Sequence, residues 1–448
     1  MDRMQELNDI LNEPTPPALE TSVKRAKARY KKSRVGRWCG IPVASLAGAA
    51  ALFVLLVNTS IPFARACGGI PILKEFAAAV AFSPSLKAAV ENDYVQLVGQ
   101  EQTVNGVTMK IEYIIADKRQ VNIFYSITDG EVDTFFAEPE ITDLNGERFA
   151  SSEYGGSPSG ARGELRKLTA NFLAQDTPSS FRFSLSIWKD GYQKSEPVAQ
   201  FSTDVNLDPA FLKAGRDYPV NQTVMLDGQS VTVKRVEVYP THATVTVTQA
   251  ESNTASVRGL DLSLVDEAGH RAEGVKNGIS ASDVGARETV YYLESNYFWT
   301  SKELTVEITG ASLRDKGSEY VTLDLENGVA LDALPQGVTL GAAIRWANRA
   351  EVVLFGHEPD GHDERNMVSY SIVGLTYYDP EGGEHQLDGT STTHGEMTLL
   401  PNGERLTIPE GCFTEEFTLH DYPWDSVELE VLFSRRLKFA EPVTVTIK

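Results

Sequence analysis

The side chains best suited to metal binding or acid-base chemistry are seven histidines and one acidic stretch. The histidines are His242, His270, His357, His362, His385, His394 and His420. None belongs to a His-Glu-x-x-His motif or pairs with a cysteine at zinc-ligand spacing. The stretch His357-Glu-Pro-Asp-Gly-His-Asp-Glu364 offers oxygen ligands for a divalent cation, but it lacks the spacing of a calcium loop. We therefore expect isolated surface histidines, a solvated hairpin tip at 357–364, and no metal or cofactor.

One sequence match suggests nucleophilic catalysis. Ser186-Ile-Trp-Lys189 has the Ser-x-x-Lys pattern of acyl-serine enzymes. That pattern works when both residues lie one turn apart on a helix, whereas here they belong to an alternating strand and point to opposite faces. The sequence also lacks a phosphate-binding glycine loop and a nucleophile elbow. We predict that the protein is not an enzyme and has no catalytic residue.

Three Asp-x-x-Gly turns reveal an internal repeat. They lie at 143–146, 266–269 and 379–382, which separates them by 123 and 113 residues. Asp opens such a turn through its side-chain hydrogen bonds, and Gly takes the positive φ that closes it, so turn chemistry explains these residues without a metal. Each turn follows an opening hairpin (104–111, 226–233, 334–340) and a second strand (121–127, 243–248, 350–355). Two closing strands complete each copy: 181–187 with 198–205, 304–308 with 320–325, and 427–433 with 443–447.

The repeat predicts a mainly β protein with three tandem immunoglobulin-like β-sandwich domains. A sheet with one apolar face must bury it, and a second sheet packed about 10 Å away does so. Some seven strands in about 110 residues fit an immunoglobulin-like sandwich. The predicted sandwiches span 99–212, 213–329 and 330–448, joined by short linkers as a beaded rod. A helical linker at 64–98, a transmembrane helix at 38–63 and a short, helical cytosolic tail at 1–37 precede them.

The transmembrane prediction rests on the stretch Cys39–Val57, which contains no ionisable side chain except its first cysteine. Nineteen residues in a helix cover about 28 Å, close to the hydrocarbon thickness of a bilayer. Eight Lys and Arg residues precede it between 24 and 37, and only Arg65 follows closely. This asymmetry predicts a single-pass cell-membrane protein with a cytosolic N-terminus and an extracellular C-terminal region. Two alternatives are a buried helix and a signal peptide cleaved after Ala64-Arg65-Ala66.

The charge distribution limits the partners of the large part of the chain. The first 40 residues carry nine basic and five acidic side chains, a net charge of +4. The whole chain has a net charge of −21, so the remainder carries −25. Nucleic-acid binding needs a basic surface, so we expect no nucleic-acid partner. The basic run before the span favours contact with lipid headgroups. Three cysteines cannot make a disulfide framework, although Cys67 and Cys412 would pair if the extracellular region folded back on the membrane.

The tail carries two narrow apolar stripes at helical spacing, separated by Pro14-Thr-Pro16-Pro17. The residues that we expect to bind a cytosolic partner are Met4, Leu7, Ile10, Leu11, Leu19 and Val23. A tail this short cannot bury both stripes in its own core, so they need a partner groove or the membrane surface. The alternative is a disordered leader whose basic half only sets topology.

The order of segments resembles a known family. It comprises Pro14 to Leu19, the basic run, one span, Ile70-Pro-Ile-Leu73, and Leu86-Lys-Ala-Ala-Val-Glu-Asn-Asp-Tyr-Val95 before a strand-rich region. This resembles Gram-positive single-pass membrane proteins with an extracellular domain of unknown function, commonly regarded as anti-sigma factors of extracytoplasmic-function sigma factors. The segments Tyr218–Val224 and Gly228–Thr241 resemble a second, immunoglobulin-like domain often found in them. The resemblance covers about 14–330 and implies a cytosolic sigma factor as partner, although the His-x-x-x-Cys-x-x-Cys motif of better-known anti-sigma factors is absent.

Together these features predict a membrane-anchored, non-enzymatic regulator, similar to an anti-sigma factor, whose extracellular region senses or binds an unidentified ligand or protein. The alternative is a structural or adhesive rod displayed on the surface, in which the tail serves topology alone. An envelope hydrolase is a third hypothesis with no motif behind it. The partners of the regulator would be the lipid bilayer, a sigma factor and the extracellular ligand or protein.

Overall fold

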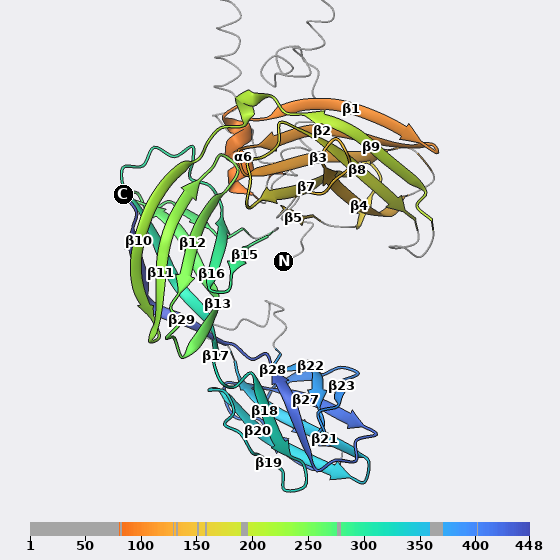
Figure 1. The fold of residues 1–448 in the computed structure, drawn as a ribbon, viewed down its shortest axis with the longest axis vertical. Helices are drawn as coiled ribbons and strands as arrows, with labels where there is room; N and C mark the ends of the chain where they lie inside the picture. Colours follow the sequence, from red (N-terminus) through yellow and green to blue (C-terminus); the bar gives the residue numbers. More distant parts are fainter. Residues whose placement is uncertain are drawn as a thin grey trace, which may run out of the picture.

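The computed structural model describes residue 80 and residues 83–448, except 129, 131–132, 150–151, 157–158, 190–195, 276–278, 359–370 and 401. The chain is mainly β, as predicted, and the strands form antiparallel sheets (Figure 1). Among the described residues, no helix has both the length and the apolar character needed to cross a bilayer. The predicted span at 38–63, the tail and its six candidate binding residues all lie outside the described residues.

The first sandwich packs two sheets around one apolar core. One sheet has the order β1 (Gln96–Val104), β2 (Val107–Ala116), β3 (Gln120–Thr128), β7 (Leu165–Phe172) and β5 (Ser152–Gly155). The other has the order β6 (Ser159–Ala161), β4 (Thr134–Thr142), β8 (Ser180–Trp188) and β9 (Ala199–Asn206). Alternate residues of both sheets point inward, as the period of a strand requires, and Tyr125 of β3 packs against Phe183 of β8 in the core.

The second sandwich repeats this strand order but takes its last strand from the end of the chain. Its first sheet has the order β10 (Arg216–Leu226), β11 (Gln229–Val238), β12 (Ala243–Gln249), β16 (Glu288–Leu293) and β15 (Ala281–Gly285). Its second sheet has the order β14 (Arg271–Glu273), β13 (Ala255–Asp266), β17 (Leu304–Asp315) and β29 (Arg435–Thr446). Val445 of β29 is fully buried in this core.

The third sandwich is inserted between β17 and β29. One sheet has the order β19 (Val329–Ala330), β18 (Tyr320–Asp324), β28 (Ser426–Val431), β22 (Val373–Tyr378) and β23 (Glu384–Gln386). The other has the order β20 (Val338–Trp346), β21 (Arg349–His357), β27 (Cys412–His420) and β24 (Ser391–His394). A separate hairpin of β25 (Met397–Leu399) and β26 (Arg405–Thr407) contributes Leu406 to a small apolar cluster with Val353 and Phe355 of β21.

The second and third sandwiches have exchanged their closing strands. In the first sandwich β8 pairs with β9, the next strand along the chain. In the second, the place of β9 is taken by β29, which pairs with β17 from Thr305↔Thr446 to Leu313↔Arg435. In the third it is taken by β18, which pairs with β28. The predicted grouping of 330–448 as one sandwich is therefore wrong for the last strand, and 320–324 belong to the third sandwich rather than the second.

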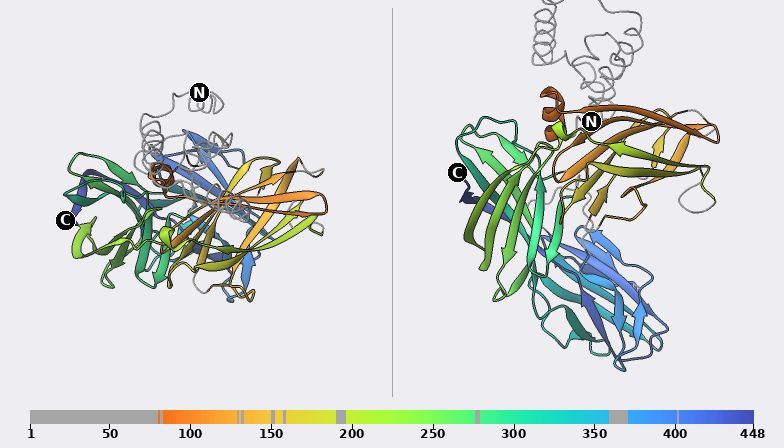
Figure 2. Two further views of the ribbon diagram at one scale, coloured as in Figure 1. Left: turned by 90° about the horizontal axis from the view of Figure 1, so that it is seen from above. Right: turned by 45° about the horizontal axis from the view of Figure 1, so that its top comes forward.

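The crossing between these two sandwiches is held by polar contacts. Arg435 lies 3.1 Å from Asp227 and 3.4 Å from Asp315, and the Arg314 side chain donates to the carbonyl of Leu432 at 2.9 Å. The connections 316–319 and 432–434 are short, so the two sandwiches are joined by two chain segments. Figures 1 and 2 show the first and second sandwiches side by side and the third continuing from the end of the second. The three units therefore do not form the predicted rod of separate beads.

The three Asp-x-x-Gly turns have the predicted chemistry. In the first, the amides of Asn145 and Glu147 each donate to Asp143 Oδ1 at 2.8 Å, and Gly146 has φ +90°. The turns opened by Asp266 and Asp379 contain the same pair of amide donors. These hydrogen bonds lower the pKa of Asp143, the bond from Glu147 contributing most. Turn geometry therefore accounts for all three aspartates.

The described part of the predicted linker is a packed helix. α6 (Pro84–Glu91) begins where the apolar pattern is interrupted, with Ser83 as N-cap and Pro84 at the first helical position. Leu86, Ala89 and Val90 are buried against the outer face of the first sandwich, beside Tyr113 and Phe124. The helix is therefore fixed on the domain that it precedes.

The strand exchange predicts where a substitution in β29 acts. Replacing Val445 with Asp places a carboxylate in the core of the second sandwich, which should destabilise it by about 4 kcal/mol or more. Hydrogen exchange followed by mass spectrometry should show loss of protection in β13 and β17, with β27 still protected. Thr446→Asp on the exposed side of the same strand is the control. Loss of protection confined to the third sandwich would contradict the exchange.

Candidate functional site

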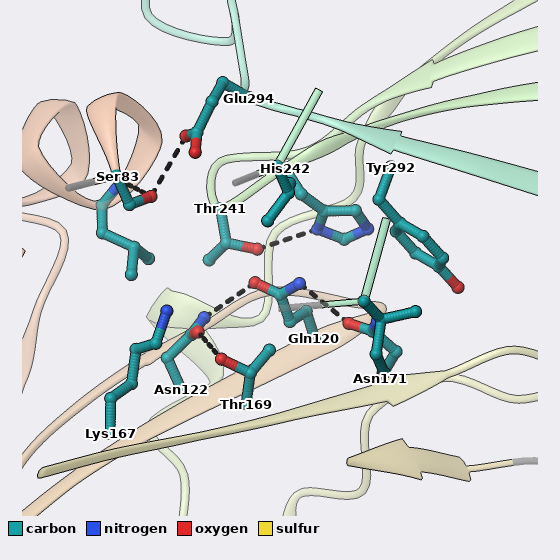
Figure 3. Close-up of a pocket in the computed structure, with 13 residues that line it drawn as sticks. Ser83, Gln120, Asn122, Lys167, Thr169, Asn171, Thr241, His242, Tyr292 and Glu294 are labelled. Carbon is teal, nitrogen blue, oxygen red and sulfur yellow. Dashed lines mark hydrogen bonds between the residues drawn. The ribbon is translucent and has the colours of Figure 1, made fainter. Parts of the chain in front are cut away.

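A pocket of about 170 Å³ lies between the first and second sandwiches, beside the first turn of α6. The first sandwich contributes the outer faces of β3 and β7, and the second contributes the β11–β12 turn and the end of β16. Figure 3 shows the side chains of the first sandwich along the lower wall and those of the second along the upper wall. Any movement of one sandwich relative to the other therefore changes this pocket.

Asp117 joins the two sandwiches next to the pocket. It follows β2 in the tight turn to β3 and is fully buried. Its Oδ1 accepts from the amides of Arg119 at 2.9 Å and Gln120 at 3.0 Å, within its own sandwich. Its Oδ2 accepts from the amide of Thr241 at 3.0 Å and its hydroxyl at 2.5 Å, across the interface. The carboxylate is thus shared by one turn from each sandwich.

These donors keep Asp117 ionised although it is out of water. Burial is the largest influence and by itself raises the pKa of a carboxyl group. His242, whose Nδ1 lies 3.7 Å from Oδ2, opposes burial together with Thr241 and the Arg119 amide, and the pKa of Asp117 ends below its usual value. Two of the four hydrogen bonds to this buried charge therefore exist only while the two sandwiches stay in contact.

Glu294 binds α6 to the second sandwich from the other side of the pocket. It follows β16 and is 8% exposed. Its Oε2 accepts from the amide of Ser85 at 2.8 Å, from the Ser83 hydroxyl at 3.1 Å and from the Ser85 hydroxyl. The Ser85 hydroxyl also accepts from the amide of Ser295 at 2.5 Å. A carboxylate in this position stabilises a helix N-terminus, so α6 is fixed to both sandwiches.

The lower wall of the pocket is a row of hydrogen-bonded polar side chains. Gln120 donates to Asn171 Oδ1, and Asn122 donates to Gln120 Oε1, both at 2.8 Å. Thr169 donates to Asn122 Oδ1 at 2.9 Å. β3 and β7 pair directly at these positions, which places all four side chains on the face opposite the core. The row leaves both Nδ2 hydrogens of Asn171 without a partner among the described residues.

Lys167 stands at the end of this row and points towards the Ser83 end of α6 (Figure 3). It forms no hydrogen bond or ion pair with any residue that the structure describes. Burial lowers the pKa of Lys167, and the charge of Glu294 partly opposes that change. An ammonium and a carboxylate therefore line the same pocket without direct contact.

Aromatic packing completes the interface beside α6. The Tyr94 ring meets Phe211 of the inter-sandwich linker and Phe298 of the second sandwich edge-on, at 5.4 and 6.2 Å between centroids. Its hydroxyl donates to the carbonyl of Phe211 and accepts from the amide of Lys213 at 3.3 Å. Burial raises the pKa of Tyr94, so the hydroxyl keeps its proton and continues to donate.

The sequence led us to expect that all the histidines lie on the surface, and this is wrong for His242. His242 is 2% exposed and stacks on Tyr239 with 5.2 Å between ring centroids. His270 and His385 each lie 2.8 Å from the aspartate that opens their turn. His394 approaches Glu358 at 3.1 Å, and residues 359–364 of the expected hairpin tip at 357–364 lie outside the described residues. Within the described ranges, no group of three His, Cys, Asp or Glu side chains is arranged to hold a metal.

The structure places the Ser-x-x-Lys match and one of the two cysteines considered for pairing. Ser186 is part of β8 and Lys189 follows the end of that strand, so the pair is not on a helix. Cys412 is half-buried at the start of β27, and Cys67 lies outside the described residues. Ser186, Lys189 and Cys412 are not among the residues that line the interdomain pocket. The pocket residues themselves were missed because each is an ordinary turn or strand residue in sequence.

Comparison with known proteins identifies two regions. Residues 36–129 match DUF4179, a domain of unknown function, and residues 215–337 match DUF5643, a family of unknown function. The second match includes β18, which pairs in the third sandwich, and leaves out β29. A search of curated proteins finds no match. A crystal structure of a conserved domain protein from Bacillus anthracis is similar over 52% of this chain and 82% of its own, at 16% identity and a TM-score of 0.37.

The interface predicts a specific effect of replacing Asp117 with Asn. An amide cannot accept from all four donors as an anion does, so the variant should lose about 3 kcal/mol of stability at pH 7. The pKa of Asp117 is lower in the folded state than in the unfolded state. The ionised carboxylate therefore contributes fully to the free energy of unfolding above the unfolded-state pKa near about 4, and this contribution is lost as pH falls through the folded-state pKa.

The difference in the free energy of unfolding between wild type and Asp117→Asn should therefore become smaller below about pH 4. Calorimetric unfolding of the full chain between pH 7 and pH 3 measures this difference. Asp176→Asn is the matched control, since Asp176 is exposed and 3.0 Å from Lys118 on the surface, where ion pairs contribute little. Equal stability of the two variants at pH 7 would refute the role assigned to Asp117.

Proposed function

We propose that this protein is a membrane-anchored, non-enzymatic regulator of the anti-sigma-factor type, with its β-rich region outside the cell as the sensing part. The observation that carries the proposal is the position of α6. This helix is the first described element after the predicted span, and Glu294 of the second sandwich fixes it against the first. A change at the interdomain pocket therefore acts directly on the chain that leads back to the predicted membrane segment.

The buried carboxylates make this interface suited to two discrete states. Asp117 and Glu294 accept hydrogen bonds from more than one element, and separating the elements removes the Thr241 donors from Asp117 and the α6 donors from Glu294. A partly satisfied buried network is costly, so the contact is either complete or opened to water. The two regions of unknown function that match the chain cover α6 and the second sandwich without β29, which is compatible with this proposal.

We also propose that the three sandwiches belong to the immunoglobulin-like class. Each has two antiparallel sheets, and corresponding strands follow the same spatial order in all three. This fold by itself does not decide between binding and other roles, so the proposed function rests on the interdomain contacts.

The strand exchange favours the second candidate, a surface-displayed structural or adhesive rod. Two chain segments join the second and third sandwiches, which resists their separation. The two functions differ in their need for the tail. Replacing residues 1–37 with an unrelated basic sequence should abolish the function of a regulator and leave the function of a structural or adhesive rod unchanged.

The regulator proposal predicts that residues 1–37 bind a sigma factor. Fused to a carrier protein, this segment should capture a sigma factor from cell extract, and Leu7→Asp or Leu19→Asp should abolish capture by placing a charge on an apolar stripe. Asn8→Asp lies off the first stripe and serves as the control. If no sigma factor binds the wild-type segment, the regulator proposal fails.

A further inference from the structure

We propose that the interdomain pocket binds a small zwitterion of the size and charge of an α-amino acid, with its carboxylate on Lys167 and its ammonium on Glu294. The pocket is lined by both side chains, which come from different structural units. Lys167 belongs to β7 of the first sandwich and Glu294 follows β16 of the second. A ligand that bridges them would join the two sandwiches.

The charges of the pocket favour a zwitterion over a simple anion. Lys167 has no hydrogen-bond or ion-pair partner among the described residues, so it offers three donors to a carboxylate. Glu294 uses only Oε2 for its contacts with Ser83 and Ser85, which leaves Oε1 to accept from an ammonium. An anion alone would satisfy Lys167 but would face the negative charges of Glu294 and Asp117.

Neutral side chains form the rest of the lower wall. Lys167 and Asn171 lie four residues apart on β7, which is about 13 Å along a strand, so a ligand of a few heavy atoms bound at Lys167 does not reach Asn171. The four hydrogen-bonded side chains of the wall hold each other in place, so the wall is ordered before a ligand arrives.

The volume limits the ligand to a few heavy atoms. A cavity of about 150 Å³ in a protein interior accommodates benzene, which has six heavy atoms. The pocket here is about 170 Å³, so it suits alanine and molecules of similar size. Leu86 and Val275 at its edge provide apolar contact for a short side chain.

Binding itself does not depend on the regulatory role, whereas its use as a signal rests on the function proposed above. A ligand on both Lys167 and Glu294 would favour the closed interface and so hold α6 in place. The two proposals can fail separately, because ligand binding is measured without a sigma factor and sigma-factor capture is measured without a ligand.

The test is calorimetric titration of the full chain in detergent micelles with L-alanine, D-alanine, propionate and ethylamine. At least one alanine enantiomer should bind, and propionate and ethylamine should bind about tenfold more weakly or not at all, since each lacks one charge. Lys167→Met should weaken alanine binding by about tenfold or more. Lys189→Met is the matched control, because Lys189 is exposed and is not among the residues that line the pocket.

Folding of each variant is checked by circular dichroism. If Lys167→Met does not fold, the comparison of the four ligands on the wild-type protein still decides the question. Absence of alanine binding, propionate binding as tight as alanine, or equal binding by Lys167→Met and wild type would each overturn the proposal.

Discussion

The interface between the first two sandwiches depends on two carboxylates held away from water. Asp117 and Glu294 would each be costly to bury alone, and each accepts hydrogen bonds from a unit other than its own, Asp117 from Thr241 and Glu294 from the start of α6. The aromatic contacts of Tyr94 add apolar burial at the same seam. Polar satisfaction therefore sets the relative orientation of the two units, and helix α6 is fixed as part of the same arrangement.

Much of the fold follows from the sequence because alternation and turn chemistry are local. The period-two strands, the Asp-x-x-Gly turns and the helix start at Ser83 are visible in short windows, and the structure has them. The exchange of β18 and β29 is not visible in this way. Both strands have the alternation that a closing strand needs. They occupy equivalent positions, β29 in the second sandwich and β18 in the third. Only the direction taken at 316–319 and 432–434 distinguishes the two pairings, and residue patterns do not encode it.

The site was harder to predict than the fold for a related reason. Gln120, Asn122 and Lys167 occupy the face of a sheet opposite its core, where polar residues normally meet solvent. Asp117 and Thr241 lie in tight turns, where such residues are common for local reasons. Their burial comes from contact between units that are more than a hundred residues apart in sequence. Sequence patterns that report on one element cannot report on such a contact.

The inserted third sandwich also affects the order in which the protein is made. β29 leaves the ribosome after every strand of the third sandwich, and it supplies part of the core of the second sandwich. The second sandwich consequently cannot close until the whole of the third has been synthesised, although its other strands are complete more than a hundred residues earlier. The usual sequence of N-terminal units folding before C-terminal ones is thus reversed for this pair. During synthesis the edge of β17 stays open and must wait for its partner.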